Sequence, residues 1–267
     1  MPPFQPHPDR RPVFVAGASS GIGEATARWL GKAGYPVALG ARRVEKCKEI
    51  AEQIIADGGE AMAVALDVTD DDSVLEAVRE VEKAWGPIEV AISGAGDLGV
   101  GRTHEISVDK WAEQINIHLI GAFRLYRAIV PGMIERRRGD FVFIGSDVAV
   151  HPRPWSSAYV AAKTGVDGLV ATVQMELEGT GVRASIIRPG QTLTGMGMNL
   201  DQDDTTAMLE DWIAFGLARH GNFLEPDNLA QAIAAIVGMP PGAHMRVVEV
   251  EAEGKLKKSD KSQPEKK

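Results

Sequence analysis

The chain has 267 residues and a mass of 28.6 kDa, with 44% hydrophobic and 25% charged residues. That composition is typical of a globular protein with a large core, and it excludes a chain that is disordered over most of its length. Lys and Arg together number 29 and Asp and Glu 37, so the formal net charge is −8. We do not expect nucleic-acid binding, because contacts to the phosphate backbone need a basic surface.

The two ends of the chain differ from its body in composition. Residues 1–12 contain five prolines and are expected to form an irregular lead-in. Residues 255–267 hold six Lys and two acidic residues, a charge of 6 − 2 = +4. We therefore predict a charged, disordered tail over residues 251–267.

Cysteine usage and hydropathy bear on the compartment. Cys47 is the single cysteine, and the chain does not start with a basic segment followed by an apolar one, so a cytoplasmic protein without disulfides is expected. No uncharged apolar run approaches the ~18 residues of a membrane span. The longest candidate, residues 229–243, is interrupted by Pro240 and Pro241.

Short apolar runs alternate along the chain with segments of helical spacing. The runs cover residues 13–18, 36–40, 61–66, 88–93, 140–145, 183–187 and 246–250. The helical segments cover residues 25–33, 44–56, 73–85, 108–134, 159–177 and 228–237. Such runs are typical of parallel strands with helices on both faces of the sheet. Right-handed crossovers then predict a Rossmann-like, doubly wound, seven-stranded parallel α/β sheet in a single domain over residues 13–250.

Two charged clusters are assigned to helix ends. Thr69 is expected to cap a helix whose first turn holds the acidic residues 70–72, where the helix dipole favours anions. This interpretation is preferred to metal binding, and no metal site is predicted. The basic residues 136–138, followed by Gly139, are expected to end the long helix. Docking of an acidic partner on these arginines is the alternative.

The first apolar run leads into a glycine-rich turn that opens a helix. The turn consists of Gly17, Ala18, Ser19, Ser20, Gly21, Ile22 and Gly23. Glycines let the backbone approach a pyrophosphate, and a helix N-terminus supplies free N–H groups. Between the first strand and the first helix of a βαβ unit, this turn predicts a dinucleotide site.

The end of the second run indicates which dinucleotide is bound. NAD-binding proteins place an acidic residue there for the ribose hydroxyls, whereas an Arg accommodates the 2′-phosphate of NADP. The chain has Arg42 and Arg43 at this point, and Glu45 lies too far into the following helix. Two cations at a helix N-terminus oppose the dipole, and a 2′-phosphate would explain them. The sequence favours NADP(H), with NAD(H) as the alternative.

Three residues suggest acid–base chemistry on a carbonyl or an alcohol. Ser146 follows the run 140–145, at the expected carboxyl end of a strand, where ligands bind in open α/β sheets. Tyr159 and Lys163 are four residues apart in a helical segment and so share one face. A nearby ammonium is expected to lower the pKa of Tyr159 towards neutrality, which makes it a candidate general acid or base. Asn116 is a further candidate, because it is polar and lies between two isoleucines of the long helix.

In their order and spacing these motifs resemble the short-chain dehydrogenase/reductase family, in its single-domain form, over residues 13–250. The glycine turn with Ala16 before it matches the family pattern Thr-Gly-x-x-x-Gly-x-Gly, and Ser146 lies thirteen residues before the Tyr-x-x-x-Lys of Tyr159 and Lys163. Further matches are Asp67 and Val68 after the third run, Asn116 in the long helix, and the turn Pro189-Gly190 with Thr194 downstream.

The resemblance implies a role for each matched residue. Tyr159 would exchange the proton, and Lys163 would bind the nicotinamide ribose and tune Tyr159. Ser146 would position the substrate oxygen, and Asn116 would hold a water that relays protons to Lys163. The implied cofactor contacts are Gly17, Ser19, Ser20, Gly21, Ile22, Gly23, Arg42, Arg43, Asp67, Val68, Gly94, Ala95, Gly96, Tyr159, Lys163, Pro189, Gly190, Thr192 and Thr194.

The chain departs from the family pattern at three places. Residues 93–96 read Ser-Gly-Ala-Gly where the family has Asn-Asn-Ala-Gly, and Ala16 replaces the usual Thr. The side-chain hydrogen bonds that brace the adenosine side in the family are therefore not expected in this chain. Arg188, just before the Pro-Gly turn, is also unusual, and the sequence assigns it no role.

The family places a mobile substrate lid after the Pro-Gly turn, in this chain residues 192–225. The segment is apolar and rich in methionine: Met196, Met198, Leu200, Met208, Leu209, Trp212, Ile213, Phe215 and Leu217. Such a lid suggests a lipophilic substrate, although ordinary packing of a helix face gives the same pattern. The expected pocket residues are Val148, His151, Trp155, Met196 and Trp212.

Together these patterns predict an NADP(H)-dependent oxidoreductase that interconverts a ketone and a secondary alcohol on a lipophilic small molecule. One alternative is reduction of a 3-oxoacyl thioester on a carrier protein, docked on Arg124, Arg127 and residues 136–138. A different class is a nucleotide-sensing regulator without turnover. The resemblance also implies a homo-oligomer, a tetramer or dimer, formed through the segments 108–134 and 159–177.

Overall fold

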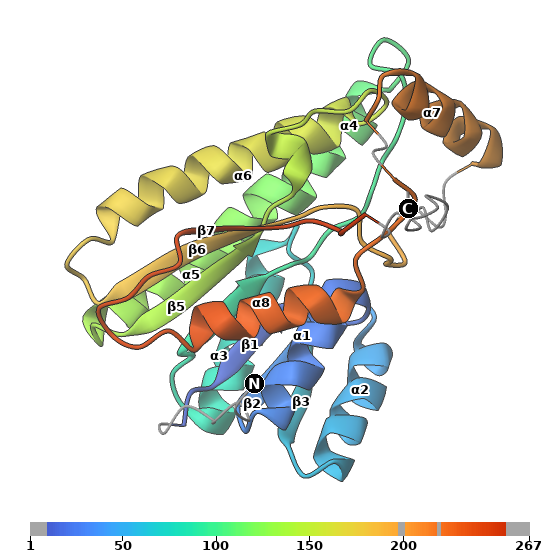
Figure 1. Ribbon diagram of the computed structural model, residues 1–267. Helices are drawn as coiled ribbons and strands as arrows, with labels where there is room; N and C mark the ends of the chain where they lie inside the picture. Colours follow the sequence, from blue (N-terminus) through green and yellow to red (C-terminus); the bar gives the residue numbers. More distant parts are fainter. Residues whose placement is uncertain (1–9, 197–200, 218–219, 255–267) are drawn as a thin grey trace, which may run out of the picture.

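The computed structural model describes residues 10–196, 201–217 and 220–254 (Figure 1). Its strands are β1 (Val13–Ala16), β2 (Pro36–Ala41), β3 (Glu60–Ala65), β4 (Val90–Ser93), β5 (Gly139–Ile144), β6 (Val182–Pro189) and β7 (Val247–Val250). They form one parallel sheet in the order β3-β2-β1-β4-β5-β6-β7. The predicted Rossmann-like, seven-stranded sheet is confirmed.

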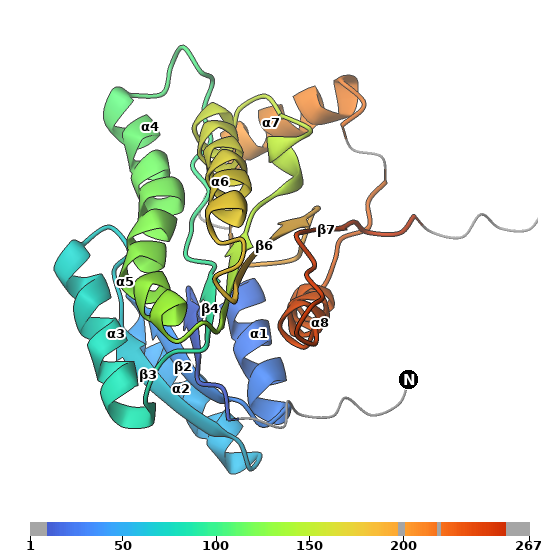
Figure 2. The ribbon, with the colours of Figure 1, turned by 90° about the vertical axis from the view of Figure 1, so that its left-hand side faces the viewer.

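Helices cover both faces of the sheet, as the buried strands require. They are α1 (Gly21–Lys32), α2 (Val44–Ala56), α3 (Asp71–Trp85), α4 (Val108–Ile115), the π-helical turn η1 (Asn116–Ile120), α5 (Gly121–Glu135), the 3₁₀ turn η2 (Asp147–Ala149), α6 (Ser157–Glu176), α7 (Gln202–Ala214) and α8 (Pro226–Val237). Figure 2 shows α1 and α8 on one side of the sheet and α3, α5 and α6 on the other. Each side has its own apolar core.

The strand order determines where a ligand can bind. β1 pairs with both β2 and β4, so the crossovers of the chain diverge on either side of β1. In open α/β sheets, ligands bind outside the carboxyl ends of the strands at such a switch point. The glycine turn follows β1 and the segment 94–97 follows β4, and both lie at that end of the sheet.

The long helical segment predicted over residues 108–134 is not a continuous α-helix. It consists of α4, one π-helical turn (η1) and α5. Residues Val108–Glu135 are long and apolar enough to meet the length and composition of a membrane span. Their buried residues, such as Leu125 and Ile129, belong to the same apolar core as β5 and α6, so the segment is a core helix of the fold.

Two details of helix ends differ from the prediction. Asp70, not Thr69, caps α3: its carboxylate accepts a hydrogen bond from the backbone N–H of Ser73 at 2.7 Å. Thr69 instead donates its hydroxyl to Asp67, 2.7 Å away. Gly139 does not end the helix, because α5 stops at Glu135 and Gly139 already begins β5.

The predicted terminal segments and the lid are described only in part. Arg11, in the predicted lead-in, is buried, and Ala252, in the predicted tail, packs on the core. Residues 1–9 and 255–267 lie outside the described residues, as do the lid residues Met198 and Leu200. Within the predicted lid the structure contains α7, a helix that the sequence patterns did not predict.

Candidate active site

A cleft of about 500 Å³ opens at the carboxyl ends of the central strands. Every residue predicted to contact the cofactor lines it, from Gly17 after β1 to Thr194 after β6. Ser146 lines the same cleft, beside Tyr159 and Lys163. The fold therefore gathers the glycine turn, the two arginines and the acid–base residues around one space.

The floor of the cleft consists of closely packed backbone. Gly17 has a φ of +84°, and a Cβ atom built on it would lie 2.7 Å from the backbone of Ala95. The N–H of Gly94 donates to the carbonyl of Ala16 at 3.0 Å, and that of Gly17 to the carbonyl of Gly40 at 2.8 Å. Backbone hydrogen bonds thus join β1 to its neighbours where the family's amide side chains are missing.

The start of α1 can receive an anion. Ser20 is the N-cap residue of α1, yet its side chain accepts no hydrogen bond from the first helical turn. The free N–H groups and the positive end of the helix dipole therefore face the cleft without a side-chain cap. The serine hydroxyls are instead bound by Arg43, which donates to Ser19 at 3.0 Å and to Ser20 at 2.8 Å.

Arg42 and Arg43 are exposed at the rim of the cleft, directly after β2. Together with the two serine hydroxyls they form a cationic, donor-rich corner. On the same side, Asp67 accepts two hydrogen bonds from Thr69, which lower the pKa of its carboxyl. Asp67 is thus held as a carboxylate by its neighbour and does not pair with either arginine.

The acid–base residues are brought together by β5 and α6. Lys163 is buried, and its Nζ donates to the carbonyl of Ile144 at 2.7 Å and lies 5.6 Å from the centre of the Tyr159 ring. Ser146 is buried at the end of β5 and donates its hydroxyl to Asp147 at 3.2 Å. The carboxylate of Asp147 forms an ion pair with Arg153.

Burial dominates the proton affinities in this cluster. It raises the pKa of Tyr159 to about 12, against the lowering effect of a hydrogen bond with Ser146. It lowers the pKa of Lys163 to about 8, although the charge of Asp167 acts in the opposite direction. The expected lowering of the Tyr159 pKa towards neutrality is not found in this arrangement, because desolvation of the phenolate outweighs the lowering effects of Ser146 and Arg153.

The polar residue of the long helix that lines the cleft is His118, not Asn116. The Asn116 amide oxygen accepts a hydrogen bond from Arg124 at 2.9 Å, and Asn116 does not line the cleft. His118, two residues later on η1, lines the cleft with its ring 5.0 Å from that of Tyr159. The position of Asn116 thus gives no support to its predicted role.

The sequence analysis missed His118. It is a polar residue within an apolar stretch, which is the same signal that drew attention to Asn116.

Comparison with known proteins agrees with this site. The family model described as short chain dehydrogenase matches residues 11–205. The chain belongs to the short-chain dehydrogenase family. It is an oxidoreductase that interconverts an alcohol and a carbonyl group with a nicotinamide cofactor.

Two curated relatives illustrate the range of the family. The chain is 32% identical over 195 residues to 2,3-dihydro-2,3-dihydroxybenzoate dehydrogenase of Bacillus subtilis strain 168, covering 73% of this chain and 75% of the relative. It is also 32% identical over 199 residues to a 3-oxoacyl-[acyl-carrier-protein] reductase of Staphylococcus epidermidis RP62A, covering 74% of this chain and 82% of the relative.

Solved structures of similar proteins share the fold over nearly their whole length. An alcohol dehydrogenase from Thermococcus sibiricus in complex with 5-hydroxy-NADP has a TM-score of 0.77 and 29% identity, over 91% of this chain and 96% of that one. A single-residue variant of actinorhodin polyketide ketoreductase with NADPH has a TM-score of 0.82 and 28% identity, over 92% and 97%. Both relatives were thus solved with a phosphorylated dinucleotide or its analogue.

Of the five predicted pocket residues, only Met196 lines the cleft of this short-chain dehydrogenase. His151 is exposed to solvent, and Val148, in the loop that begins with Ser146, is buried. Trp155 donates its indole N–H to Asp211 at 2.7 Å, and Trp212 donates to the carbonyl of Pro154 at 3.1 Å. The two tryptophans therefore attach α7 to the loop between Ser146 and Tyr159.

Arg188, which the sequence left without a role, joins two elements of the dehydrogenase. Its guanidinium is 2.7 Å from Asp167 on α6 and 2.6 Å from Glu249 on β7. It thereby holds the edge strand β7 against α6, close to the Pro-Gly turn. Its role is structural.

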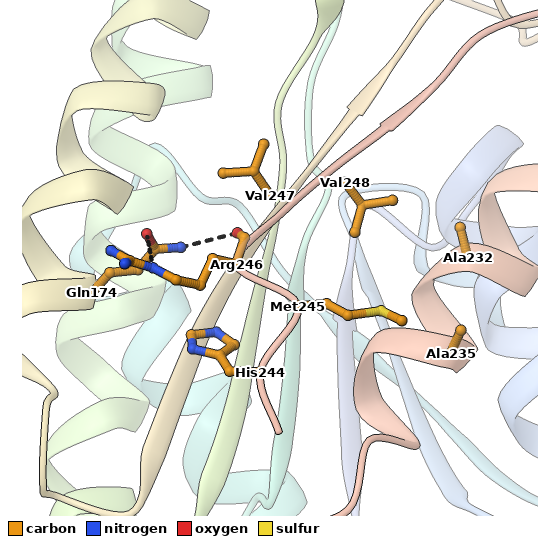
Figure 3. Close-up of a pocket in the computed structure, with 8 residues that line it drawn as sticks. All are labelled: Gln174, Ala232, Ala235, His244, Met245, Arg246, Val247 and Val248. Carbon is orange, nitrogen blue, oxygen red and sulfur yellow. Dashed lines mark hydrogen bonds between the residues drawn. The ribbon is translucent and has the colours of Figure 1, made fainter. Parts of the chain in front are cut away.

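A second, larger hollow of about 750 Å³ lies between α6, β7 and α8 (Figure 3). Gln174 donates to the backbone carbonyl of Arg246 at 2.9 Å and accepts from its guanidinium at 3.2 Å. His244 contacts the carbonyl of Ala184 at 2.9 Å. The polar side chains of this hollow are thus bound to the protein itself, and no predicted site residue of the dehydrogenase lines it.

Proposed function

We propose that this dehydrogenase uses NADP(H) to interconvert a ketone and a secondary alcohol on a lipophilic small molecule, with Tyr159 as the general acid or base. The observation that carries the proposal is that Tyr159, Lys163 and Ser146 line the same cleft as the glycine turn and the two arginines. A cofactor seated along this cleft would have its phosphates at α1 and its reactive ring at Tyr159.

The cationic corner supports NADP(H) over NAD(H). Arg43 is oriented by Ser19 and Ser20, and Arg42 lines the same corner. A 2′-phosphate would accept charge-assisted hydrogen bonds from these guanidinium groups, whereas the bare ribose hydroxyl of NAD would leave two cations facing a helix N-terminus. The residues at this corner therefore fit the phosphorylated cofactor.

In the proposed reaction, each of the three acid–base residues has one task. When bound, the reduced nicotinamide supplies a hydride to the carbonyl carbon. The Tyr159 hydroxyl donates its proton to the carbonyl oxygen, and Ser146 donates a hydrogen bond to that oxygen. The Lys163 ammonium, fixed by the Ile144 carbonyl, stabilises the tyrosinate that remains. For alcohol oxidation the same residues act in reverse.

Titration with NADPH and NADH, followed by nicotinamide fluorescence, tests the cofactor preference. We expect NADPH to bind at least about tenfold tighter, and Arg42→Ala or Arg43→Ala to weaken NADPH alone by about 10- to 100-fold, the value of a lost charge-assisted hydrogen bond. Arg79→Ala is the matched control, because Arg79 is exposed on α3 beside Glu76. Equal affinities for the two cofactors in the parent protein would contradict the assignment.

Reduction of a carrier-bound 3-oxoacyl thioester is the alternative within the same chemistry, and three of the similar proteins are named 3-oxoacyl-[acyl-carrier-protein] reductase. The arginines proposed for docking are largely used within the chain. Arg124 pairs with Asp71, Arg138 pairs with Glu89, and Arg136 donates to the carbonyl of Ile88. A small lipophilic ketone therefore remains the favoured substrate class.

A further inference from the structure

An acidic side chain directly after Ser146 lies next to the acid–base residues. Asp147 is 8% exposed on the 3₁₀ turn η2, and its carboxylate accepts a hydrogen bond from the Ser146 hydroxyl at 3.2 Å. Ser146 also shares a hydrogen bond with Tyr159. A hydroxyl group has one proton, so Ser146 cannot donate to Asp147 and to a substrate oxygen at the same time. Asp147 therefore competes with the substrate for this donor.

Arg153 offsets the charge of Asp147. Its guanidinium forms an ion pair with the carboxylate, and its Nη1 donates at 3.4 Å to Oδ1, the same oxygen that accepts from Ser146. Both side chains of the pair are largely buried, so solvent screens their charges little. Beside the dominant effect of burial, the charge of Asp147 raises the pKa of Tyr159 and that of Arg153 lowers it. Without Arg153, the carboxylate would hold the Ser146 hydroxyl more strongly.

The helix α7 supports Arg153 from the other side. The guanidinium lies over the ring of Trp212, 5.3 Å from the ring centre. Trp212 also donates its indole N–H to the carbonyl of Pro154 at 3.1 Å, so α7 is attached to the loop that leads into α6 (Figure 2). A guanidinium is attracted to the face of an indole ring and stacks on it. Arg153 is thus held between Asp147 and α7.

A second contact of the same kind attaches α7 but does not involve Asp147. The guanidinium of Arg102 lies over the ring of Trp155 at 4.5 Å and is 3.8 Å from Asp211 on α7. Trp155 in turn donates its indole N–H to Asp211 at 2.7 Å. Arg102 therefore holds the same helix through an indole and a carboxylate, and it provides a matched control for Arg153.

We propose that Arg153 is a positioning residue for the reaction. By pairing with Asp147, it leaves the Ser146 hydroxyl free to turn to the substrate oxygen, and α7 keeps it in place through Trp212. In the free enzyme the hydroxyl donates to Asp147, and when a ketone binds, it donates to the carbonyl oxygen beside Tyr159. The seating of α7 and the orientation of Ser146 are thereby linked through one guanidinium. The inference rests on the proposed function, because it requires Ser146 to bind the substrate oxygen.

Steady-state kinetics with NADPH, and with acetophenone and menthone as the ketones, test the role of Arg153. Arg153→Met leaves the charge of Asp147 unpaired, and we expect kcat to fall about 10- to 100-fold with KM within about threefold of the parent. Adding Asp147→Asn removes that charge and should restore kcat to within about fivefold of the parent. A pair that only braces the loop would give a double variant no more active than Arg153→Met. That result, or parent-like kcat in Arg153→Met, would overturn the proposal.

Trp212→Leu tests the link to α7. We expect it to lower kcat about 3- to 10-fold in the parent, but less than about twofold in Asp147→Asn, where no carboxylate charge has to be offset. Arg102→Met should keep kcat within about threefold of its background in both proteins. An equal fall for Trp212→Leu in both backgrounds would refute the link. If Arg153→Met does not fold, as judged by NADPH fluorescence, the two Trp212→Leu proteins decide the question.

Variants of Ser146 and Tyr159 separate a failure of this inference from a failure of the proposed function. Ser146→Ala and Tyr159→Phe should each lower kcat by at least about tenfold. In Ser146→Ala, adding Arg153→Met should change kcat less than about twofold, because no hydroxyl is left to position. A further tenfold loss there would overturn the role of Arg153. If Ser146→Ala and Tyr159→Phe both stay active, the proposed function fails; if both are impaired and Arg153→Met is not, only the inference about Arg153 fails.

Discussion

At Tyr159 the effects of burial and of charge oppose each other. Burial, with a smaller contribution from the charge of Asp147, raises the pKa of the phenol to about 12, while the hydrogen bond with Ser146 and the charge of Arg153 act to lower it. A phenol with such a pKa remains protonated at physiological pH and can donate its proton to a carbonyl oxygen. Alcohol oxidation needs the tyrosinate, so in that direction the phenol must first lose its proton.

Removing the Tyr159 hydroxyl should abolish the proton donor without opening the cleft. We expect Tyr159→Phe to lower kcat/KM for ketone reduction by about 10²- to 10⁴-fold, the usual contribution of general acid catalysis. NADPH affinity, measured by fluorescence, should stay within about threefold of the parent value. Tyr126→Phe is the control, because Tyr126 packs on Phe141 and Phe143 in the core. Full activity in Tyr159→Phe would refute the assignment.

The lowered pKa of Lys163 predicts the pH dependence of the reaction. Burial lowers it to about 8, so the ammonium that stabilises the tyrosinate is lost as pH rises through 8, while Tyr159 stays protonated up to about 12. Plots of kcat/KM for ketone reduction against pH should therefore be flat below about 8 and fall above it. Asp167→Asn removes a charge that raises this pKa and should move the fall to lower pH. A fall at unchanged pH in that variant would contradict the assignment of the fall to Lys163.

The sequence predicted which residues line the cofactor part of the cleft better than it predicted the properties of the catalytic residues. The glycine turn, Arg42 and Arg43 follow strands directly, so strand ends alone placed them around one cleft. The raised pKa of Tyr159 was not predictable, because it depends on how much of the phenol the fold buries. At Ser93 and Gly94, where the family's amides are missing, backbone hydrogen bonds connect the same strands.

At the scale of elements, the π-helical turn changes which face of the long helix each residue occupies. A continuous α-helix keeps one angular phase along its length, and the helix predicted over residues 108–134 assumed this. The turn η1 inserts one extra residue, so the faces of α4 and α5 are rotated with respect to each other by about 100°. Hydropathy patterns do not reveal such an insertion, because the residues on both sides remain apolar.

The sequence patterns did not predict helix α7, for a different reason. Its sequence is mixed in polarity, and Met208 is its one residue classed as buried within the described chain. The helix is held by long-range contacts: Trp155, with a φ of +69°, bonds Asp211, and Arg153 lies over the ring of Trp212 at 5.3 Å. These contacts join segments more than fifty residues apart, so local sequence gives no sign of them.

At the scale of the whole molecule, a buried ion cluster joins the amino ends of the strands. Asp140, 2% exposed at the start of β5, pairs with Arg11 before β1 and with Arg183 on β6 at 2.6 Å. Arg183 also donates to the carbonyl of Ala243 at 2.7 Å, and Arg11 to that of Val237 at 3.1 Å. A carboxylate between two guanidinium groups thus ties the chain's first described residues to the end of α8.

Neutralising Asp140 should therefore destabilise the fold. Asp140→Asn removes the carboxylate shared by buried Arg11 and half-buried Arg183, and we expect a loss of about 3–5 kcal/mol in the free energy of unfolding, measured with urea. Glu76→Gln, which breaks an exposed pair with Arg79, should cost less than about 1 kcal/mol. A loss below about 1 kcal/mol in Asp140→Asn would show that the cluster is not stabilising.

Oligomer formation remains a prediction of the family resemblance. The α4–α5 segment exposes Ile120 and Phe123, and α6 exposes Gly168, Ala171 and Met175 on the outer side of the sheet. These are the surfaces that the resemblance assigned to a dimer or tetramer. The catalytic residues described above all come from a single chain.

The ion cluster lies far from the cleft, so substitutions near the cleft should leave its contribution to stability unchanged. The cluster sits at the amino ends of β5 and β6, and the cleft at their carboxyl ends, so a strand of six to eight residues separates them, roughly 20–25 Å at the rise of a β-strand. Sites that far apart contribute almost additively to free energies. New substrates can therefore be sought by altering the loops above the sheet, while the charges below it maintain the fold.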